Sequence, residues 1–258
     1  MHTMKEKLDA FQHLLEIMEE LRIKCPWDRE QSMESLRNLT IEETYELADA
    51  ILEEDLEEVR KELGDLILHI VFYAKIGSEK GAFDIADVLK GINSKLIFRH
   101  PHVFGEREVK DSGEVIENWE ELKMKEGNKS VLAGVPNSLP AMIKSHRIQD
   151  KARAVGFDWD QKEQVWDKVH EEINEVKQEL RNGNQKERME EELGDLLFSV
   201  VNAARLYDIE PETALEKTNR KFIKRFRYLE SRAGEMGRSL KEMSLEEMEA
   251  IWQEAKST

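Results

Sequence analysis

The stretch Glu192-Leu193-Gly194-Asp195-Leu196 lies in the second half of the chain, and the same five residues occur in the first half as Glu62-Leu63-Gly64-Asp65-Leu66. An acidic cluster precedes each copy, Glu171-Glu172-Ile173-Asn174-Glu175 in the second half and Glu42-Glu43-Thr44-Tyr45-Glu46 in the first. The interval between cluster and pentapeptide is sixteen positions in the first copy and seventeen in the second. A constellation that recurs once in each half of a chain indicates internal duplication, so the sequence predicts two related modules.

The spacing of the acidic residues predicts a metal site. Residues three apart on a helix share a face, so Glu172 and Glu175 project together. Glu192 and Asp195 do the same on the following helix. If these helices lie side by side and antiparallel, four carboxylates converge, which is costly unless a cation neutralises them. Mg²⁺ and Mn²⁺, which prefer oxygen ligands, are the natural candidates. The equivalent side chains of the first half, a second candidate site, are Glu43, Glu46, Glu62 and Asp65.

An acidic pattern alone is a weak indication, because a chain so rich in glutamate is expected to contain it by chance. Residues 53–57 repeat the pattern without a Gly-Asp partner at the same distance, and we interpret them as a solvated helix face. The specific signal is the duplicated pairing of both elements. In addition, Gly194 lies between Glu192 and Asp195, beside an apolar stripe. A glycine there lets another group approach closely at some cost in helix propensity, which favours a functional site over an ordinary surface helix.

Composition excludes several classes of function. The chain of 258 residues carries 39 basic and 55 acidic residues, a net charge of −16, which disfavours nonspecific binding to nucleic acid or to an anionic membrane. Cys25 is the only cysteine, so no intrachain disulfide can form and a reducing compartment is indicated. The sequence contains neither an apolar run long enough to span a bilayer nor an apolar signal core. We therefore expect a cytoplasmic protein.

Apolar residues recur with a helical period and strand-like alternation is nearly absent, so the predicted fold class is all-α, built from duplicated helical bundle modules. The helices expected in the first half span about 4–23, 31–53, 55–79 and 85–100, with another around Trp119. Asp84 is expected to cap the fourth of them. Those expected in the second half span about 141–154, 162–181, 186–207, 211–233 and 244–256. Residues 127–140, rich in Gly, Pro, Ser and Asn, predict a linker between an N-terminal domain, 1–126, and a C-terminal domain, 141–258.

Basic and aromatic residues are duplicated as well. Asn93-x-Lys95-x3-Arg99 matches Asn219-x-Lys221-x3-Arg225, and Trp119-x3-Lys123 matches Trp252-x3-Lys256. Lys221 and Arg225 are four positions apart on one helical face and suit a phosphate chain. In isolation such a pair is an ordinary charged face, and a tryptophan at helical spacing is more often part of a core than a stacking platform. The recurrence of the basic pair after each acidic pair favours the functional interpretation.

With these residues in view, the chain resembles the MazG-type nucleoside triphosphate pyrophosphohydrolases. The acidic pairs match that family's Glu-Glu-x-x-Glu…Glu-x-x-Asp metal motif in both halves. Three further stretches resemble family signatures, and the likeness covers essentially the whole chain in a two-domain arrangement. These stretches are Cys25-Pro26-Trp27-Asp28, Arg99-His100-Pro101-His102-Val103-Phe104 and Val155-Gly156-Phe157-Asp158-Trp159.

The resemblance implies an all-α, Mg²⁺-dependent, usually dimeric enzyme whose four-helix modules are completed between subunits. It implies hydrolysis of nucleoside triphosphates, ATP among them, to the monophosphate and pyrophosphate, chiefly through the carboxy-terminal copy. The implied metal ligands are Glu172, Glu175, Glu192 and Asp195, with Glu171 holding a second metal or the attacking water. The implied phosphate-binding residues are Lys168, Lys221 and Arg225, while Trp252 lies at the nucleotide and Lys123 reaches the site from the first half.

A non-enzymatic alternative competes with this interpretation. An acidic helical adaptor could use its duplicated clusters only to bind metal or a basic partner. Such an adaptor would not require the Asn-x-Lys-x3-Arg element after each cluster, so the presence of that element in both halves favours the enzyme.

Overall fold

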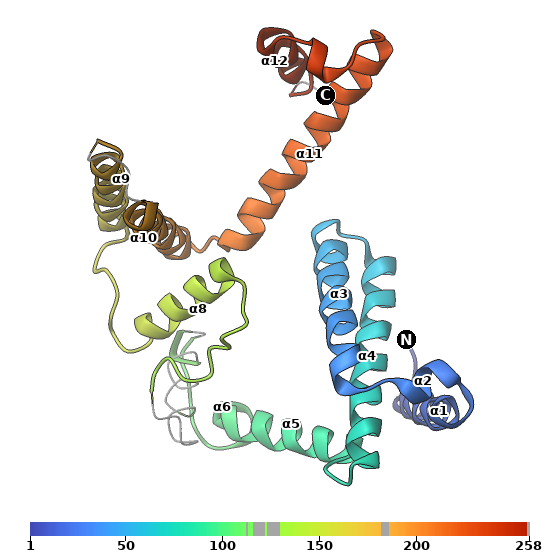
Figure 1. Ribbon diagram of the computed structural model, residues 1–258. Coiled ribbons are helices and arrows are strands. Elements are labelled where there is room, and N and C mark those ends of the chain that lie inside the picture. The colour runs from blue at the N-terminus through green and yellow to red at the C-terminus, as the bar shows by residue number, and fades with distance from the viewer. Residues whose placement is uncertain (112, 116–121, 123–129, 182–185, 257–258) are drawn as a thin grey trace. The chain divides into compact units, whose positions relative to one another are not determined.

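The structure is a computed structural model that describes residues 1–111, 113–115, 122, 130–181 and 186–256 (Figure 1). The chain divides into two compact units, Met1–Glu108 and Val109–Thr258, which are described separately below. All regular elements in the described ranges are helices, so the predicted all-α fold class is confirmed. No helix among the described residues is long and apolar enough to cross a membrane.

The first unit is built around an antiparallel pair of helices. Its elements are α1 (Met4–Lys24), α2 (Pro26–Glu30), α3 (Met33–Leu52), α4 (Leu56–Glu79), α5 (Ile85–Arg99) and α6 (Pro101–Phe104). The α3 and α4 helices pack along their lengths and are joined by a short turn, as Figure 1 shows in blue and cyan. Asp55 begins α4 by accepting hydrogen bonds from two backbone N–H groups of the first turn. Asp84 caps α5 in the same way, as expected.

The α3–α4 pair owes its position to an apolar core shared with α1. Met18 of α1, Leu36 of α3 and Phe72 of α4 are buried against one another. An ion pair between Arg22 and Glu79 joins the carboxyl ends of α1 and α4 at the edge of this core. Burial of their apolar stripes therefore fixes the two acidic helices of this unit, and their acidic residues lie on the edges outside the core.

The second unit contains the equivalent helix pair with different surroundings. Its elements are α8 (Ala141–Arg153), η1 (Lys162–Gln164), α9 (Val165–Arg181), α10 (Lys186–Leu206), α11 (Pro211–Glu235), η2 (Leu240–Glu242) and α12 (Leu245–Glu254). The α9 and α10 helices pack against each other, with Val165, Val169 and Ala203 buried in the seam. The α8 helix packs on α10, while α12 folds back on the carboxyl-terminal part of α11 (Figure 1).

Some details differ from the expectations. The helix expected from residue 162 begins as the 3₁₀ turn η1 and becomes α-helical at Val165. The close approach expected at Gly194 is not found among the described residues, since a Cβ at this position would meet no atom within 4 Å, and the same holds at Gly64. The helix expected around Trp119 lies outside the described residues.

Contacts assign residues 109–126 to the second unit, whereas the sequence analysis places them in the first domain. Most residues of this stretch lie outside the described ranges, so the division into 1–126, a linker 127–140 and 141–258 stays a prediction.

Candidate active site

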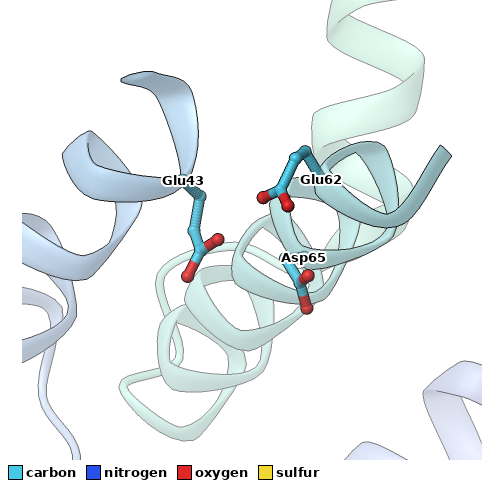
Figure 2. Close-up of side chains that lie close together, drawn as sticks. All are labelled: Glu43, Glu62 and Asp65. Carbon is cyan, nitrogen blue, oxygen red and sulfur yellow. The ribbon is translucent and has the colours of Figure 1, made fainter. Parts of the chain in front are cut away.

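Three carboxylates converge in the first unit. Glu43 projects from α3, and Glu62 and Asp65 project from α4 one turn apart (Figure 2). One oxygen from each lies within 4.8 Å of the others. Glu62 is only 5% exposed, because the α3–α4 seam covers it. The helix pairing thus brings together three of the four residues predicted for this copy.

The second unit repeats the arrangement on α9 and α10. Glu172 of α9 and Glu192 and Asp195 of α10 offer oxygens within 4.8 Å of one another. Glu172 is 4% exposed, whereas Asp195 lies at the open side of the cluster. The spacing of three residues on α10 places both of its carboxylates on the edge that faces α9, as the sequence predicts.

The fourth predicted member of each site lies beside its cluster. Burial raises the pKa of Glu175, and the negative charges of Glu172 and Glu192 raise it further. In the first unit, burial raises the pKa of Glu62, and Glu46 is the first of the neighbouring charges that add to this effect. Glu46 and Glu175 are therefore near enough to be felt electrostatically but are outside the groups of three converging oxygens.

Both clusters have the charge and burial expected of a site that holds a cation. The Oε2 atoms of Glu62 and Glu172 are buried and have no hydrogen-bond partner among the described residues. A buried carboxylate oxygen without a donor is costly, and crowding with like charges adds to that cost. Carboxylate oxygens at this separation suit a hard divalent cation, so the residues present fit Mg²⁺ or Mn²⁺.

One lysine distinguishes the two clusters. Lys168 lies one turn before Glu172 on α9, and its ammonium is 2.7 Å from a Glu172 oxygen and 3.0 Å from Glu171. Hydrogen bonds to Glu172 and Glu171 raise the pKa of Lys168, so this group stays charged. The equivalent position of the first unit, four residues before Glu43, is Leu39, which packs against the apolar core. At this position the second cluster therefore has a positively charged lysine, where the first has a leucine.

A cavity of about 920 Å³ opens beside the second cluster. Lys168, Glu172 and Asp195 lie at its polar part. The remaining wall is mainly apolar and comes from α8, α10 and the loop before α9. Its lining includes Ile148, Gln149, Ala152, Val155, Phe157, Trp159, Phe198 and Asn202. A concave, largely apolar space next to a few convergent charges is the usual form of a small-molecule site.

An ion pair between the buried Arg205 and the partly exposed Asp158 holds the loop that forms one side of this cavity. Arg205 of α10 is 4% exposed and donates hydrogen bonds from both terminal nitrogens to Asp158, while its Nε donates to Asn202 at 3.0 Å. Burial alone would raise the pKa of Asp158, but its contacts with Arg205 hold the pKa below the usual range. Gly156 has φ +84°, a conformation that glycine adopts readily, and it lets the chain turn from α8 into this loop.

We expect Asp158→Asn to lower the free energy of unfolding by about 2 kcal/mol, because it leaves the buried Arg205 guanidinium without a charged partner. Denaturant titration near neutral pH measures the loss. The contribution of Asp158 is present above its ordinary pKa and is lost as the pH falls below it, since the folded-state pKa is depressed. The exposed neighbour Asp160 is the control, and an equal loss in Asp160→Asn would contradict this account.

The predicted basic and aromatic residues form a separate group on α11 and α12. The Arg225 guanidinium lies 6.0 Å from the centre of the Trp252 ring, and the Phe222 ring is 5.0 Å from it. Neither Lys221 nor Arg225 lines the cavity beside the second cluster. Lys123 lies outside the described residues. The described structure therefore joins Lys168 to the carboxylates but leaves the other predicted phosphate-binding residues on a different surface of the same unit.

Sequence reasoning missed several residues of the cavity wall, among them the polar side chains of Gln149, Ser199, Asn202 and Arg205. Arg205 carries a signal in principle, since it lies on the apolar stripe of α10, where a charged residue needs a partner. The burial of Gln149 follows from the packing of α8 on α10 and has no local signature.

The fold and the two sites define a duplicated, all-helical protein with one acidic cluster of the metal-binding type in each module. The sequence model of the MazG nucleotide pyrophosphohydrolase domain matches residues 31–104 and again residues 161–229, which include both clusters. The chain therefore belongs to the MazG family, and the resemblance drawn from its motifs is confirmed.

Similar proteins extend over nearly the whole chain. An Escherichia coli K12 protein named nucleoside triphosphate pyrophosphohydrolase is 43% identical over 257 residues, which cover 96% of this chain and 98% of that protein. A Thermotoga maritima protein named nucleoside triphosphate pyrophosphohydrolase/pyrophosphatase MazG is 42% identical over 258 residues, 98% of each chain. The Bacillus subtilis protein YabN is 46% identical over 237 residues, 91% of this chain and 48% of that longer protein.

Proposed function

We propose that this protein is an enzyme that hydrolyses nucleoside triphosphates to the nucleoside monophosphate and pyrophosphate, mainly at the α9–α10 cluster. The observation that carries the proposal is the convergence of Glu172, Glu192 and Asp195 at the edge of a ligand-sized cavity. The names of the E. coli and T. maritima relatives, which match nearly the whole of this chain, support the same activity. The single cysteine and the acidic composition agree with action in the cytoplasm.

The residues of the second unit divide the work of phosphoanhydride hydrolysis among them. Glu172, Glu192 and Asp195, with Glu175 beside them, would hold Mg²⁺, with Mn²⁺ as a substitute. Held there, such an ion would neutralise phosphate oxygens and lower the pKa of a bound water, the chemistry that divalent ions supply in phosphoryl transfer. Lys168 holds a positive charge at the cavity edge, where triphosphate oxygens compete with Glu171 and Glu172 for its ammonium protons.

Further residues are assigned to the substrate by the family resemblance. Lys221, Arg225 and Trp252 lie away from the cavity in the described structure. We propose that the second copy of the homodimer described below supplies them, with Lys221 and Arg225 binding phosphates and Trp252 lying at the nucleotide, and that Lys123 completes the site. Glu171 is released from Lys168 when phosphate takes its place, and its carboxylate can then orient the attacking water. The residues of this chain would thus neutralise phosphate charge, position the substrate and the attacking water, and accept a proton.

The experiment that tests the proposal is an assay of pyrophosphate release from a mixed pool of nucleoside triphosphates, with Mg²⁺ and with EDTA. Mg²⁺-dependent pyrophosphate release supports the enzyme. Metal binding without any turnover would instead support the acidic adaptor, which the clusters alone also permit.

A stability measurement tests the cation site without relying on turnover. Because the pKa of Glu175 is raised in the folded state, the metal-free fold loses stability as the pH rises above the ordinary glutamate value of 4.5. Removing that charge relieves the repulsion, so we expect Glu175→Gln to raise Tm in EDTA at about pH 7.5 and to do so less at about pH 5. In Mg²⁺ we expect the Tm of Glu175→Gln to be lower than that of the wild type, because the wild-type carboxylate then has a cation beside it. A Glu175→Gln variant that is less stable than wild type in EDTA at the higher pH would contradict the repulsion between Glu175 and the neighbouring carboxylates.

We also propose that the protein is a homodimer. Both units leave rows of large apolar side chains exposed, and contiguous exposed apolar surface is typical of an interaction site. Those on α4 and α10 are Leu63, Ile67, Ile70, Leu193, Leu197 and Val200, and those on α5 are Val88, Leu89, Ile92, Leu96, Ile97 and Phe98. A helix pair buries too little surface alone, and packing of a second copy on these rows completes the bundles.

Sedimentation is expected to show a dimer at micromolar concentration. Leu197→Asp places a charge in an exposed apolar row of α10 and should shift the protein toward the monomer, whereas Arg188→Asp on the same helix should not. A fully active monomeric wild type would refute the dimer.

A further inference from the structure

The wall of the cavity beside the second cluster carries a buried polar group that none of the proposed roles uses. Gln149 of α8 is 7% exposed and lines the cavity. Its side-chain Nε2 donates a hydrogen bond of 2.9 Å to the backbone carbonyl oxygen of Phe198 on α10. Its Oε1 is buried and has no hydrogen-bond partner in the part of the chain that the structure describes. Since the Nε2 contact fixes which end of the amide is which, the free end is an acceptor.

An unpaired amide oxygen at a cavity wall indicates a ligand that brings a hydrogen-bond donor. Leaving such a group unpaired costs folding free energy, and an N–H of a bound molecule removes that cost. The ligand also meets aromatic rings. Phe157 and Trp159 line the same cavity, and Phe157 is 83% exposed on its loop although it is large and apolar. Exposed rings beside a cavity are suited to stacking on a flat heterocycle.

The position of the cavity limits the identity of that heterocycle. The cavity is continuous with Lys168, Glu172 and Asp195, where the triphosphate is proposed to bind. A molecule that presents phosphates to these residues and a ring to Phe157 and Trp159 is a nucleotide. The volume of about 920 Å³ lies within the range of small-molecule sites.

We propose, building on the pyrophosphohydrolase function above, that the space between α8, α10 and the loop through Phe157 is a nucleobase site in which Gln149 Oε1 accepts a hydrogen bond from an N–H of the base. Adenine presents its 6-amino group to this oxygen. The Asp158–Arg205 ion pair acts as a positioning element, because it fixes the loop that carries the two aromatic rings. Since every common base bears an N–H group on its hydrogen-bonding edge, one acceptor admits all of them and rejects a base that lacks the donor.

Two substrates that differ only in this donor test the inference. Purine riboside 5′-triphosphate is ATP without the 6-amino group. In the wild type we expect kcat/KM for ATP to exceed that for the analogue about tenfold, since the analogue leaves Gln149 Oε1 unpaired. In Gln149→Leu the ratio should fall to near one. Damage to the fold lowers both rates together, so the ratio isolates the hydrogen bond. Gln178→Leu, an exposed glutamine on α9, is the matched control and should keep the wild-type ratio.

A second variant covers the case in which Gln149→Leu does not fold. Phe157→Ala alters an exposed side chain, so the fold is expected to survive. It should lower kcat/KM for ATP and for purine riboside 5′-triphosphate by the same factor of about ten. Hydrolysis of ribose 5-triphosphate, which has no base, should be unchanged. Equal loss on the substrate without a base would overturn the stacking role.

Binding separates this inference from the proposed function. Calorimetric Kd values for AMP and purine riboside 5′-monophosphate need no turnover. We expect AMP to bind the wild type more tightly than the analogue does, and the two Kd values to become nearly equal in Gln149→Leu. If no triphosphate is hydrolysed but the Kd ratio depends on Gln149, the proposed function falls and the base site stands. If hydrolysis proceeds with the same substrate ratio in wild type and Gln149→Leu, the base site falls and the proposed function stands.

Discussion

Asp195→Asn is expected to lower Mg²⁺-dependent pyrophosphate release about a thousandfold while leaving the protein folded. The substitution keeps the size of the side chain but removes one of the three charges that converge with Glu172 and Glu192. An amide oxygen binds a hard cation less strongly than a carboxylate does, and the site then loses both metal affinity and the charge that sets its position. Because Asp195 lies at the open side of the cluster, the change disturbs no core packing.

The measurement is kcat and the Mg²⁺ concentration for half-maximal rate, with helicity and Tm recorded for each variant. Glu172→Gln should have a similar effect on rate, because Glu172 contributes the most buried oxygen of the cluster. Glu187→Gln, an exposed glutamate in the first turn of α10, is the matched control and should retain wild-type activity. Full turnover by folded Asp195→Asn would remove the second-unit cluster from consideration as the catalytic site.

The two copies are expected to differ in activity by a large factor. The paired variant Glu172→Gln with Glu175→Gln should abolish most turnover, whereas Glu43→Gln with Glu46→Gln should leave most of it. Both clusters bring carboxylate oxygens within 4.8 Å, so the carboxylates alone do not set them apart. The difference lies in the surroundings, since Lys168 lies on the second cluster and Leu39 takes its place beside the first.

Helix length adds to this asymmetry. The α5 helix ends at Arg99, before Pro101, whereas α11 continues to Glu235. A basic residue at the last position of a helix is held by fewer helical neighbours than one in its middle, and catalysis of phosphoryl transfer depends mostly on positioning. We therefore assign the first copy mainly to structure or to weak turnover. A larger loss of kcat from the first paired variant than from the second would reverse the assignment.

Much of the acidic clusters could be predicted from the sequence because their geometry is local. A spacing of three residues places Glu192 and Asp195 on one face of a helix whatever the rest of the chain does. The Lys168–Glu172 ion pair has the same local origin, since the two residues are four positions apart on one helix. The family resemblance implied only a phosphate-binding role for Lys168. Helix ends at Asp84 and Pro101 followed ordinary capping rules.

The cavity could not be predicted in this way because it depends on tertiary packing. Gln149 becomes a buried acceptor only when α8 lies across α10, and nothing in the sequence around it distinguishes it from a surface glutamine. The interpretation of Gly194 as a point of close approach was drawn from its place between Glu192 and Asp195, and the described structure leaves that position open. Whether a residue such as Glu175 joins a cluster or lies beside it depends on the separation of two helices, which spacing along one helix does not set.

The identity of the products of ATP hydrolysis tests the central claim most directly. Wild-type protein is incubated with ATP and Mg²⁺, and nucleotide products are separated while pyrophosphate and orthophosphate are measured in parallel. The account predicts one AMP and one pyrophosphate for each ATP consumed, with no reaction in EDTA. Formation of ADP and orthophosphate, or an equal rate in EDTA, would contradict it.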